Sequence, residues 1–271
     1  MSNKRARVAI VTGASTGIGR AVAKALKDNG FWVFGTSRRA APEQIDGIAM
    51  LTCDVTDDAS VAKLIEAVLT EAGRIDVLVN NAGVGLLGGA EESSIGQAQS
   101  LFNVNLFGVI RMTNAVLPFM RRQHTGRIVN VSSVLGLIPG PYSALYASTK
   151  HALEGYSESL DHEVRAFGIR VVLVEPAYTA TSFEENLTVP DQSLDVYALA
   201  RAGMVALMRQ VMLKADTPEA VAETVVKAVT AGSPKHRYAA GKVARQVSFL
   251  RRFVPEGAFD KSLRKQMQLP V

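Results

Sequence analysis

The stretch Val8-Ala-Ile-Val-Thr-Gly-Ala-Ser-Thr-Gly-Ile-Gly19 decides the fold, because an apolar run leads through a glycine-rich turn into a helical pattern. Residues 7–11 are predicted to form a buried strand, and Ile18 to Leu26 have the apolar spacing of a helix. A helix that begins at such a turn can bind phosphate through backbone N–H groups, and glycine allows a close approach. The spacing Gly-x-x-x-Gly-x-Gly differs from the usual Gly-x-Gly-x-x-Gly, so the turn alone is weak evidence, and glycines there also serve packing.

The rest of the chain repeats this alternation of short apolar runs and helical patterns. Further strands are expected at residues 31–35, 48–51, 77–79, 127–131 and 169–174, and helices at 61–71, 101–120 and 144–167. Strands that alternate with helices form a parallel sheet with helices on both faces. We therefore predict an α/β fold, a single doubly wound domain over residues 1–271 with a sheet of about seven strands. Residues 179–215 are expected to be an insertion, and residues 235–271 a C-terminal extension.

Polar or glycine-rich clusters follow the predicted strands. They are Thr12–Gly19, Ser37–Arg39, Asp54, Asn80–Gly83, Ser132–Ser133 and Pro176–Thr181. In an open α/β sheet, ligands bind beyond the carboxyl ends of the strands, where such clusters meet. The sequence therefore predicts one functional site along this edge of the sheet.

Composition excludes several classes of protein. With 48% hydrophobic and 20% charged residues, the chain does not have the composition of a disordered protein. Apolar runs such as Val171–Val174 fall far short of the roughly 20 residues that span a bilayer, so no transmembrane segment is expected. The one cysteine, Cys53, excludes an internal disulfide framework and a cysteine-based zinc site, and no histidine or carboxylate spacing indicates a metal. We expect a globular protein of a reduced compartment, the cytoplasm.

The segment Tyr146-Ala-Ser-Thr-Lys150 lies in a predicted helix, so its first and last side chains are neighbours on one face. The pKa of a phenol is near 10, and a nearby ammonium lowers it toward neutral pH. Such a tyrosine can act as a general acid or base. Ser133 lies thirteen residues earlier, at the end of a strand. A second match, Tyr238-Ala-Ala-Gly-Lys242, contains a glycine that weakens a helix and has no serine at that distance.

The glycine-rich turn also contains Gly13-Ala-Ser-Thr-Gly17, which formally matches the Gly-x-Ser-x-Gly turn of serine hydrolases. In this alternative Ser15 would be the nucleophile, and His236 is the histidine that lies late enough in the chain to assist it. The turn follows the first strand, which is early for such a nucleophile. A hydrolase therefore stays open as an alternative of a different class.

Together these residues resemble the short-chain dehydrogenase/reductase family, of the common non-extended type, over roughly residues 5–185. The resemblance rests on Thr12–Gly19, Asp54-Val55, Asn80–Gly83, Asn105, Ser133, Tyr146 with Lys150, and Pro176–Thr181. It implies a Rossmann domain that binds a nicotinamide cofactor and transfers a hydride to or from a CH–OH group. It also implies a homodimer or homotetramer formed through the helices at 101–120 and 144–167.

The same resemblance implies roles for four catalytic residues. Tyr146 would be the acid in carbonyl reduction and the base in alcohol oxidation, and Ser133 would hold the substrate oxygen against it. Lys150 would lower the pKa of Tyr146 and bind the nicotinamide ribose. Asn105 would hold a water molecule that connects Lys150 to solvent as a proton relay.

The resemblance also implies a set of cofactor contacts. The pyrophosphate would lie on Gly13, Ser15, Thr16, Gly17, Ile18 and Gly19, the adenine near Asp54 and Val55, the adenosine ribose near Asn81, Ala82 and Gly83, and the nicotinamide ribose on Tyr146 and Lys150. Pro176, Thr179 and Thr181 would lie near the nicotinamide amide and the phosphates. Ala177 departs from the family, which usually has glycine after this proline, and one added methyl group should be tolerated.

The choice between the two nicotinamide cofactors depends on the end of the second strand, Phe34-Gly-Thr-Ser-Arg-Arg39. An acidic residue there binds the ribose 2′-hydroxyl of NAD, whereas arginine accommodates the 2′-phosphate of NADP. Ser37 occupies the acidic position, and the guanidinium of Arg38, whose planar fork suits phosphate, follows it. NADP(H) is therefore predicted over NAD(H), although Thr16 stands where some NADP-using relatives have a basic residue. The alternative is that both arginines are solvated loop charges.

The predicted substrate pocket is apolar. It consists of Leu86, Leu135, Tyr142, Tyr178 and Phe183. Such a lining favours a lipophilic alcohol, ketone or aldehyde over a sugar or an acid. Residues 80–185 and Arg237–Gly241 also resemble the branch of 17β-hydroxysteroid and retinol dehydrogenases, which implies bulky substrates. Met204, Met208 and Met212 recur at helical spacing within 179–215, so this insertion is predicted to be an adaptable lid, with core or oligomer packing as the alternative.

The net charge of +5 is concentrated in the C-terminal extension. Residues 235–271 contain nine basic and two acidic residues, a balance of +7, which leaves −2 for the rest of the chain. No interleaving of aromatic and basic residues indicates nucleic-acid binding. Val243, Val247, Leu250 and Val254 share one helical face, so the extension could lie on an anionic membrane. For the basic residues we favour a solvated helix face over such a role, and for the apolar faces a cover over the substrate pocket or a subunit interface.

The sequence thus predicts an NADP(H)-dependent oxidoreductase that acts on a lipophilic secondary alcohol or ketone, with Tyr146 as general acid and base. The alternatives are a catalytically silent nucleotide sensor of the same fold and, third, the hydrolase with Ser15 as nucleophile.

Overall fold

A computed structural model describes residues 6–39, 43–183 and 186–267. Within them, eight strands form one sheet in the order β3-β4-β2-β1-β5-β6-β7-β8. The strands are β1 (Val8–Val11), β2 (Trp32–Ser37), β3 (Gln44–Ile45), β4 (Ile48–Thr52), β5 (Val77–Asn80), β6 (Gly126–Val131), β7 (Ile169–Pro176) and β8 (Arg237–Ala240). All neighbours are parallel except β3, a two-residue strand antiparallel to β4. The predicted parallel sheet of about seven strands is confirmed, and the two strands that the sequence did not locate are β3 and β8.

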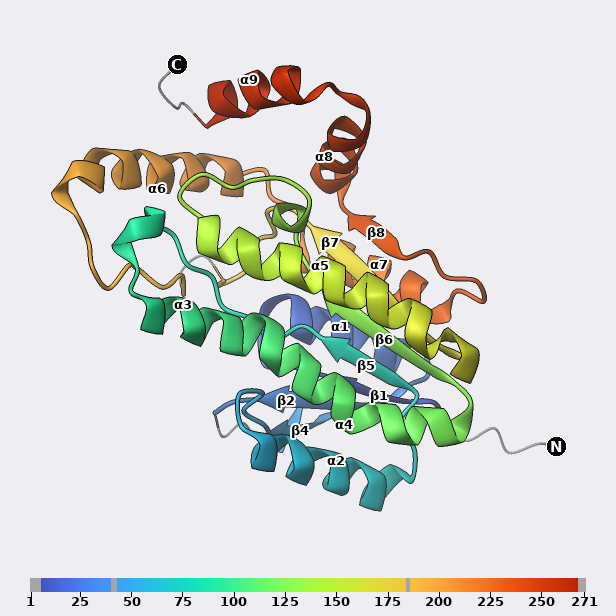
Figure 1. The fold of residues 1–271 in the computed structure, drawn as a ribbon. Coiled ribbons are helices and arrows are strands. Elements are labelled where there is room, and N and C mark those ends of the chain that lie inside the picture. The colour runs from blue at the N-terminus through green and yellow to red at the C-terminus, as the bar shows by residue number, and fades with distance from the viewer. Residues whose placement is uncertain (1–5, 40–42, 184–185, 268–271) are drawn as a thin grey trace.

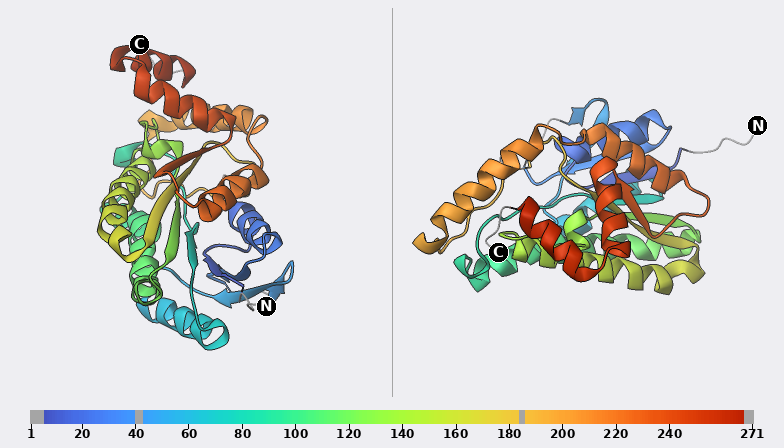
Figure 2. Two further views of the ribbon diagram at one scale, coloured as in Figure 1. Left: turned by 90° about the vertical axis from the view of Figure 1, so that its right-hand side faces the viewer. Right: turned by 90° about the horizontal axis from the view of Figure 1, so that it is seen from above.

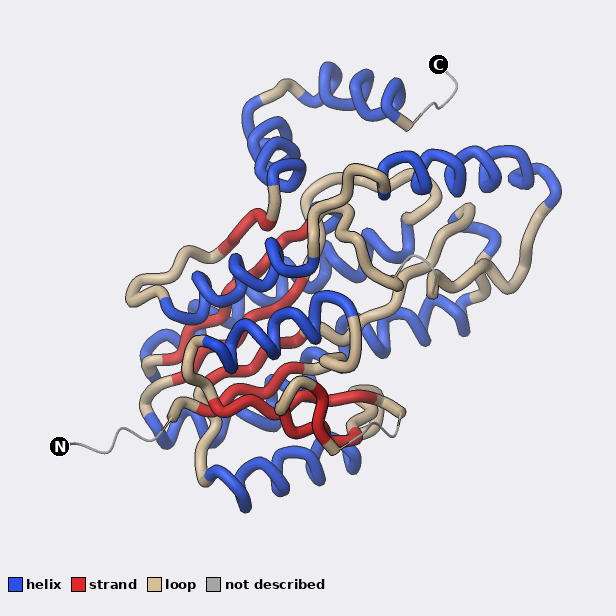
Figure 3. Tube along the Cα trace, turned by 180° about the vertical axis from the view of Figure 1, so that it is seen from behind, coloured by secondary structure: helices blue, strands red, loops and turns tan. Residues whose placement is uncertain are grey.

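Helices cover both faces of the sheet (Figures 1 and 3). One face packs against α1 (Gly17–Asp28) and α7 (Pro218–Thr230), and the other against α2 (Asp58–Ala72), α4 (Gly108–Gln123) and α5 (Ala144–Val164). The remaining helices are α3 (Ile95–Phe102), α6 (Ala198–Met212), α8 (Lys242–Phe253) and α9 (Glu256–Gln266), with short helical turns at Ala90–Glu92, Val134–Gly136, Arg165–Phe167 and Asp195–Tyr197. The arrangement is the doubly wound Rossmann-like fold that the alternating pattern predicts.

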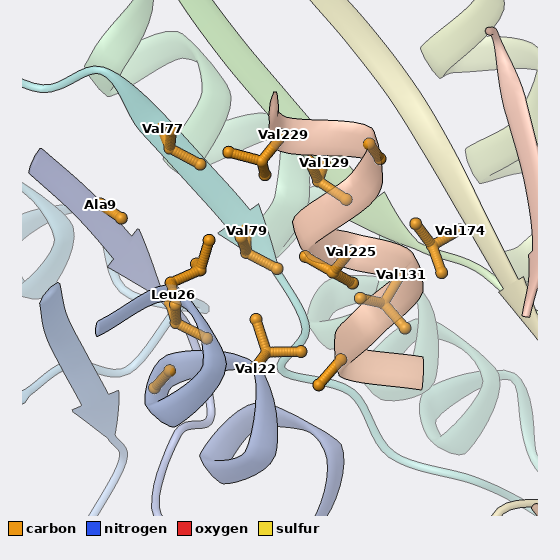
Figure 4. Close-up of a cluster of buried hydrophobic side chains, with 14 of the residues drawn as sticks. Ala9, Val22, Leu26, Val77, Val79, Val129, Val131, Val174, Val225 and Val229 are labelled. Atoms are coloured by element: carbon orange, nitrogen blue, oxygen red, sulfur yellow. The ribbon is translucent and has the colours of Figure 1, made fainter. Parts of the chain in front are cut away.

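The core lies between the sheet and its two helical layers. Val22 and Leu26 of α1 and Val225 and Val229 of α7 interdigitate over the strands (Figure 4). Each of these four side chains is at most 2% exposed, and burying one stabilises the fold by about 1.5–3 kcal/mol. Because both faces are covered, the inner strands are apolar at successive positions, which is why they read as continuous runs in the sequence.

The helix predicted at residues 101–120 is longer than expected and changes pitch. α3 continues through a π-helical segment, Asn103–Phe107, into α4 without a break in the chain direction. The helix predicted at 144–167 also changes, because α5 ends at Val164 and a tighter turn follows to Phe167. A π-helical segment within an α-helix is rare and often lies at a functional site.

The order of the strands reverses at β1, which pairs with β2 on one side and with β5 on the other. The loops after β1 and β5 therefore diverge at the carboxyl edge of the sheet. Ligands of doubly wound sheets bind in the crevice at this switch point. The turn from Thr12 to Thr16 and residues 81–83 border it directly.

The C-terminal extension joins the sheet before it leaves it. β8 pairs in parallel with β7, and Tyr238 lies in this strand, so the second Tyr-x-x-x-Lys match is not helical, as its glycine indicated. α8 and α9 then lie at the same end of the molecule as α6 (Figures 1 and 2). Arg251 of α8 donates a hydrogen bond to the carbonyl of Leu137, 3.2 Å away, beside the Val134–Gly136 turn. Across the described ranges, no helix is long and apolar enough to cross a membrane.

Candidate functional site

The glycine-rich turn adopts backbone conformations that require glycine. Gly13 has a φ of +66° and Gly17 a φ of +55°, which is the left-handed region that favours glycine. Gly19 has no positive φ, but a Cβ there would lie 2.1 Å from the carbonyl oxygen of Gly13 and 2.5 Å from Nδ2 of Asn81. The third glycine of the motif therefore lets the first turn of α1 pack directly on the loop before it.

The loop after β5 is fastened to this turn by hydrogen bonds. The hydroxyl of Thr12 accepts from the backbone N–H groups of Asn81 at 2.9 Å and Ala82 at 3.0 Å. The amide of Asn81 donates back to the carbonyl of Thr12 at 2.9 Å. These bonds hold the loop after β5 against the glycine-rich turn after β1. Gly13 and Asn81–Gly83 therefore lie next to each other, as predicted.

The N-terminus of α1 fits a bound anion. Thr16 precedes the helix in an extended conformation, its side chain makes no capping hydrogen bond, and the first turn has no acidic residue. The N–H groups of Gly17, Ile18 and Gly19 are those that an α-helix leaves without intrahelical partners. A Cβ on Gly17 would come within 3.3 Å of Thr181, so residues from the loop after β7 border the same space. A glycine-lined cradle at a helix N-terminus suits the pyrophosphate of a dinucleotide.

Ser37 ends β2, and Asp54 lies two residues beyond the end of the neighbouring strand β4. The carbonyl of Ser37 accepts a hydrogen bond from the backbone of Cys53 at 2.9 Å, which brings Arg38 and Asp54 to the same side. Hydrogen bonds from the N–H and hydroxyl of Thr56 lower the pKa of Asp54, and the charge of Arg38 contributes to this shift. The guanidinium of Arg38 is exposed. Val55 is 8% exposed and would contact an added Cβ on Gly108 at 2.8 Å, so it also has a packing role.

Asn105 lies in the π-helical segment and is 1% exposed. Its Oδ1 accepts from the N–H of Val84 at 2.9 Å, and its Nδ2 donates to the carbonyl of Val84 at 2.8 Å. Nδ2 also lies 3.2 Å from the hydroxyl of Thr149, which donates to the carbonyl of Tyr146 at 2.7 Å. Asn105 thus connects the loop after β5 to the first turns of α5. Thr149 was not singled out by the sequence, although it lies within the Tyr146-to-Lys150 motif.

Tyr146 and Lys150 lie one turn apart at the start of α5, as predicted. The Nζ of Lys150 is 5.7 Å from the centre of the Tyr146 ring and donates a hydrogen bond to the carbonyl of Val131 at 3.0 Å. Lys150 is buried, and this burial lowers its pKa to about 8, against the opposing charge of Glu154. A cation beside a phenol favours its phenolate form over its neutral form.

Ser133 follows β6 and begins the Val134–Gly136 turn. Its hydroxyl accepts a hydrogen bond from the N–H of Leu135 at 3.1 Å, which fixes the side chain at the carboxyl edge. Val131, which receives the hydrogen bond from Lys150, lies two residues earlier in the same strand. The strand β6 therefore positions the serine and anchors the lysine.

The residues predicted for the substrate pocket separate into neighbouring groups. The ring of Phe183 lies 6.1 Å from that of Tyr146, and the ring of Tyr142 lies 6.3 Å from that of Tyr197. Leu86 is 3% exposed and bridges to Thr188, whereas Leu135 would contact an added Cβ on Gly140 at 3.1 Å. Tyr178 lines a cavity of about 300 Å³ with residues of α6 and with Val243 of α8. Residues of the predicted insertion (179–215) and of the extension (235–271) thus line the same cavity as Tyr178.

The loop after β7 is itself well fixed. Pro176 ends β7, and the backbone N–H of Ala180 donates to Asp216 at 2.9 Å, while Asp216 donates to Tyr178 at 3.0 Å. Thr179 is 5% exposed, and the hydroxyl of Thr181 accepts from the N–H of Phe183 at 3.2 Å. Ala177 is not among the described residues that have a positive φ. The backbone at this position therefore does not require the glycine that the family usually has.

The geometry offers no support for the hydrolase. Ser15 follows the carboxyl end of β1, whereas His236 immediately precedes β8 and so lies at the opposite edge of the parallel sheet. His236 instead lies 3.3 Å from Asp161. No group of three or more histidine, cysteine or acidic side chains in the described ranges is arranged to hold a metal.

Beside Lys150 lies a cluster of charges that sequence reasoning missed, two buried carboxyl groups and one half-buried arginine. It consists of Glu154 on α5, Glu175 on β7 and Arg237 on β8. Glu154 could have been noticed, because it follows Lys150 at helical spacing. Its partners could not, because 83 residues separate Glu154 from Arg237.

Comparison with known proteins agrees with this geometry. A family model described as short chain dehydrogenase matches residues 7–192. The chain belongs to the short-chain dehydrogenase/reductase family. It is therefore an oxidoreductase by family, and the resemblance drawn from its motifs is confirmed.

Relatives of this short-chain dehydrogenase/reductase include a 3-ketodihydrosphingosine reductase of Bacteroides thetaiotaomicron, 42% identical over 185 residues, which are 68% of either chain. Retinol dehydrogenase 8 of Bos taurus is 34% identical over 252 residues, covering 85% of this chain and 80% of the relative. The crystal structure of a short-chain dehydrogenase from Streptomyces avermitilis is 33% identical, has a TM-score of 0.83 and covers 99% of this chain and 96% of its own. Other similar structures hold NADP⁺ or NADH.

Proposed function

We propose that this protein is an NADP(H)-dependent oxidoreductase that interconverts a lipophilic ketone or aldehyde and its alcohol, with Tyr146 as the general acid and base. The observation that carries the proposal is the buried ammonium of Lys150 beside the ring of Tyr146 at the carboxyl edge of the sheet. Burying a lysine ammonium is costly, and this one lies beside a phenol and donates a hydrogen bond to Val131 at the carboxyl end of β6. Perturbed titratable groups of this kind gather at functional sites.

The chemistry divides between the cofactor and the chain. The nicotinamide, when bound, supplies or accepts the hydride. Tyr146 donates a proton to the substrate oxygen in reduction and removes it in oxidation, and Ser133 holds that oxygen in place. Lys150 favours the phenolate by its charge and binds the nicotinamide ribose. Asn105, through Thr149, fixes the turn of α5 that bears the tyrosine.

Support for NADP(H) comes from the end of β2. Ser37 has no charge that would repel a 2′-phosphate, and the guanidinium of Arg38 is exposed directly beyond it. Arginine binds phosphate with two parallel hydrogen bonds. Glycines 13, 17 and 19 and the uncapped N-terminus of α1 fit the pyrophosphate. We assign the adenine to the loop at Asp54, the adenosine ribose to Asn81–Gly83, and the nicotinamide amide and the phosphates to Pro176–Thr181.

Support for a lipophilic substrate comes from the side chains proposed to line the pocket. Of these, the ring of Phe183 lies 6.1 Å from that of Tyr146. The set of Leu86, Leu135, Tyr142, Tyr178 and Phe183 contains no charged group that could pair with a charged substrate. Two relatives are named for lipophilic substrates, a ketone of a sphingoid base in one case and retinol in the other. We propose the same chemical class here, with residues 179–215 as a lid and with the chain acting as a single domain.

The experiment compares the wild type with Tyr146→Phe. Loss of the proton donor should lower the rate of NADPH-dependent ketone reduction at least about 100-fold. Binding of NADPH, followed by the enhancement of nicotinamide fluorescence, should be retained. A wild type that binds NADPH but reduces no lipophilic ketone would instead favour a nucleotide sensor. Failure to bind either NADPH or NADH would refute the proposal.

A further inference from the structure

Lys150 has a carboxylate neighbour, Glu154, besides the groups that the family resemblance names. Glu154 follows Lys150 by four residues on the buried face of α5, so the two side chains are neighbours one turn apart. Glu154 is 4% exposed and Lys150 is 7% exposed. At that depth the two opposite charges interact far more strongly than they would in water. The charge of Glu154 raises the pKa of Lys150 against the larger effect of burial.

Glu154 on α5 is held in position by Arg237 of the edge strand β8. Its Oε2 accepts a hydrogen bond from Nε of Arg237 at 2.9 Å, and Arg237 comes from β8, the first element of the C-terminal extension. The same Nε lies 3.4 Å from Oε1 of Glu175, which is 1% exposed at the end of β7. The two remaining nitrogens of Arg237 donate to Glu158 at 3.1 and 3.2 Å.

The positive and negative charges of this cluster are equal in number when the carboxyl group of Glu175 is protonated. Burial, and next the charge of Glu154, raise the pKa of Glu175 to about 8. The two cations Lys150 and Arg237 then face the two anions Glu154 and Glu158. Of these two anions, Glu158 lies at the surface with a side chain that is 46% exposed, so solvent screens it. Glu154 is therefore the anion that acts on Lys150.

We propose that Glu154, held by Arg237, is a positioning residue that keeps the ammonium of Lys150 protonated and thereby sets the pH range in which Tyr146 exchanges a proton. The inference rests on the proposed function of Tyr146 and Lys150. It also gives β8 a role in the active site, since the strand supplies the arginine that fixes the carboxylate. Burial raises the pKa of Glu154, and hydrogen bonds from Ser132 and Arg237 together with the charges of Arg237 and Lys150 oppose this rise and favour the carboxylate.

The test measures the ionisation of Tyr146 in the protein without cofactor. Phenolate absorbs near 295 nm, and subtracting the titration of Tyr146→Phe from that of its parent isolates this tyrosine. In Glu154→Gln, Lys150 should lose its proton at lower pH, so the phenol midpoint should rise by about one pH unit. The acidic limb of cyclohexanol oxidation with NADP⁺, where the base Tyr146 becomes protonated, should move the same way. An unchanged midpoint would overturn the inference.

Glu158→Gln is the matched control, because it makes the same change on the same helix and against the same arginine. Its exposed charge should leave the midpoint where it is. If Glu154→Gln does not fold, Glu154→Asp replaces it as the test, because it retracts the carboxylate by one methylene. The phenol midpoint of Glu154→Asp should rise by less than that expected for Glu154→Gln. An unchanged midpoint in Glu154→Asp would overturn the inference. A wild type that titrates as expected but oxidises no alcohol would count against the proposed function alone.

Discussion

At the scale of a single residue, the proposed preference for NADP(H) depends on Arg38. Its side chain is exposed immediately after β2, and the neutral Ser37 takes the position where an acidic residue would exclude a phosphate. A hydrogen bond to a charged group contributes about 1.5–3 kcal/mol. Arg38→Ala should therefore weaken NADPH binding about tenfold or more and leave NADH binding nearly unchanged, as measured by nicotinamide fluorescence.

Arg39→Ala is the natural control for this prediction, because it removes an equally exposed arginine one position along. It should alter neither affinity by more than a small factor. Equal losses of NADPH affinity in both variants would mean that the two arginines attract the nucleotide only as a general positive field. In that case the choice of NADP(H) would lose its main support.

At the scale of elements, a buried carboxylate holds the predicted lid. Glu92 is fully buried, and its side chain accepts from the N–H of Gly89 at 2.7 Å and of Leu194 at 2.8 Å and pairs with Arg201 of α6. Removing the charge leaves Arg201 without its partner, which is costly in a buried site. Glu92→Gln should raise the KM for a bulky ketone several-fold and speed proteolysis within residues 192–201, with NADPH affinity unchanged.

Glu91→Gln is the control, which tests whether the effect requires the buried carboxylate of Glu92 or any carboxylate next to the lid. Glu91 is exposed and accepts a hydrogen bond from the hydroxyl of Tyr197 at 2.6 Å. Its loss should leave both KM and the proteolysis rate close to those of the wild type. If Glu92→Gln behaves like Glu91→Gln, then residues 192–201 do not depend on Glu92 and the lid is held elsewhere.

The same elements show how far the sequence alone could predict this protein. The sheet, its helices and the motif residues on its carboxyl edge were predictable, because each depends on local periodicity or on a short spacing such as Tyr146 to Lys150. The contacts that fix the lid and the lysine were not, since 109 residues separate Glu92 from Arg201 and 83 separate Glu154 from Arg237. The π-helical segment around Asn105 was also missed, because it differs from an α-helix by one extra residue that no local pattern marks.

At the scale of the whole molecule, Asp161 joins three elements at the edge of the sheet opposite the site. Its fully buried carboxylate accepts from Arg170 at 2.9 Å and from the N–H of Val171 at 2.8 Å on β7, and it pairs with Arg165 after α5. Burial alone would raise its pKa, but the hydrogen bonds from Arg170, Arg165 and Val171 hold it at about 2. An aspartate in an unfolded chain has a pKa near 3.9.

The sign of the effect on stability follows from this difference. Because the folded protein holds the lower pKa, Asp161 stabilises it fully above about pH 4 and loses this contribution as the pH falls toward 2, by roughly 2 kcal/mol in all. Asp161→Asn should lower the free energy of unfolding in urea at pH 7 by about 3–5 kcal/mol, since it leaves buried arginine contacts unpaired. The difference in the free energy of unfolding between wild type and variant should become smaller between pH 4 and pH 2.

Asp58→Asn provides the matched measurement, because Asp58 also pairs with an arginine, Arg111, but is 87% exposed. Solvent screens such a surface pair, so its loss should leave the stability almost unchanged at every pH. A gap for Asp161→Asn that stays constant from pH 7 to pH 2 would show that the residue acts through shape and hydrogen bonding rather than through its charge. A gap that narrows only for Asp161→Asn would show that this buried charge ties α5 to β7 at the edge of the sheet away from the site.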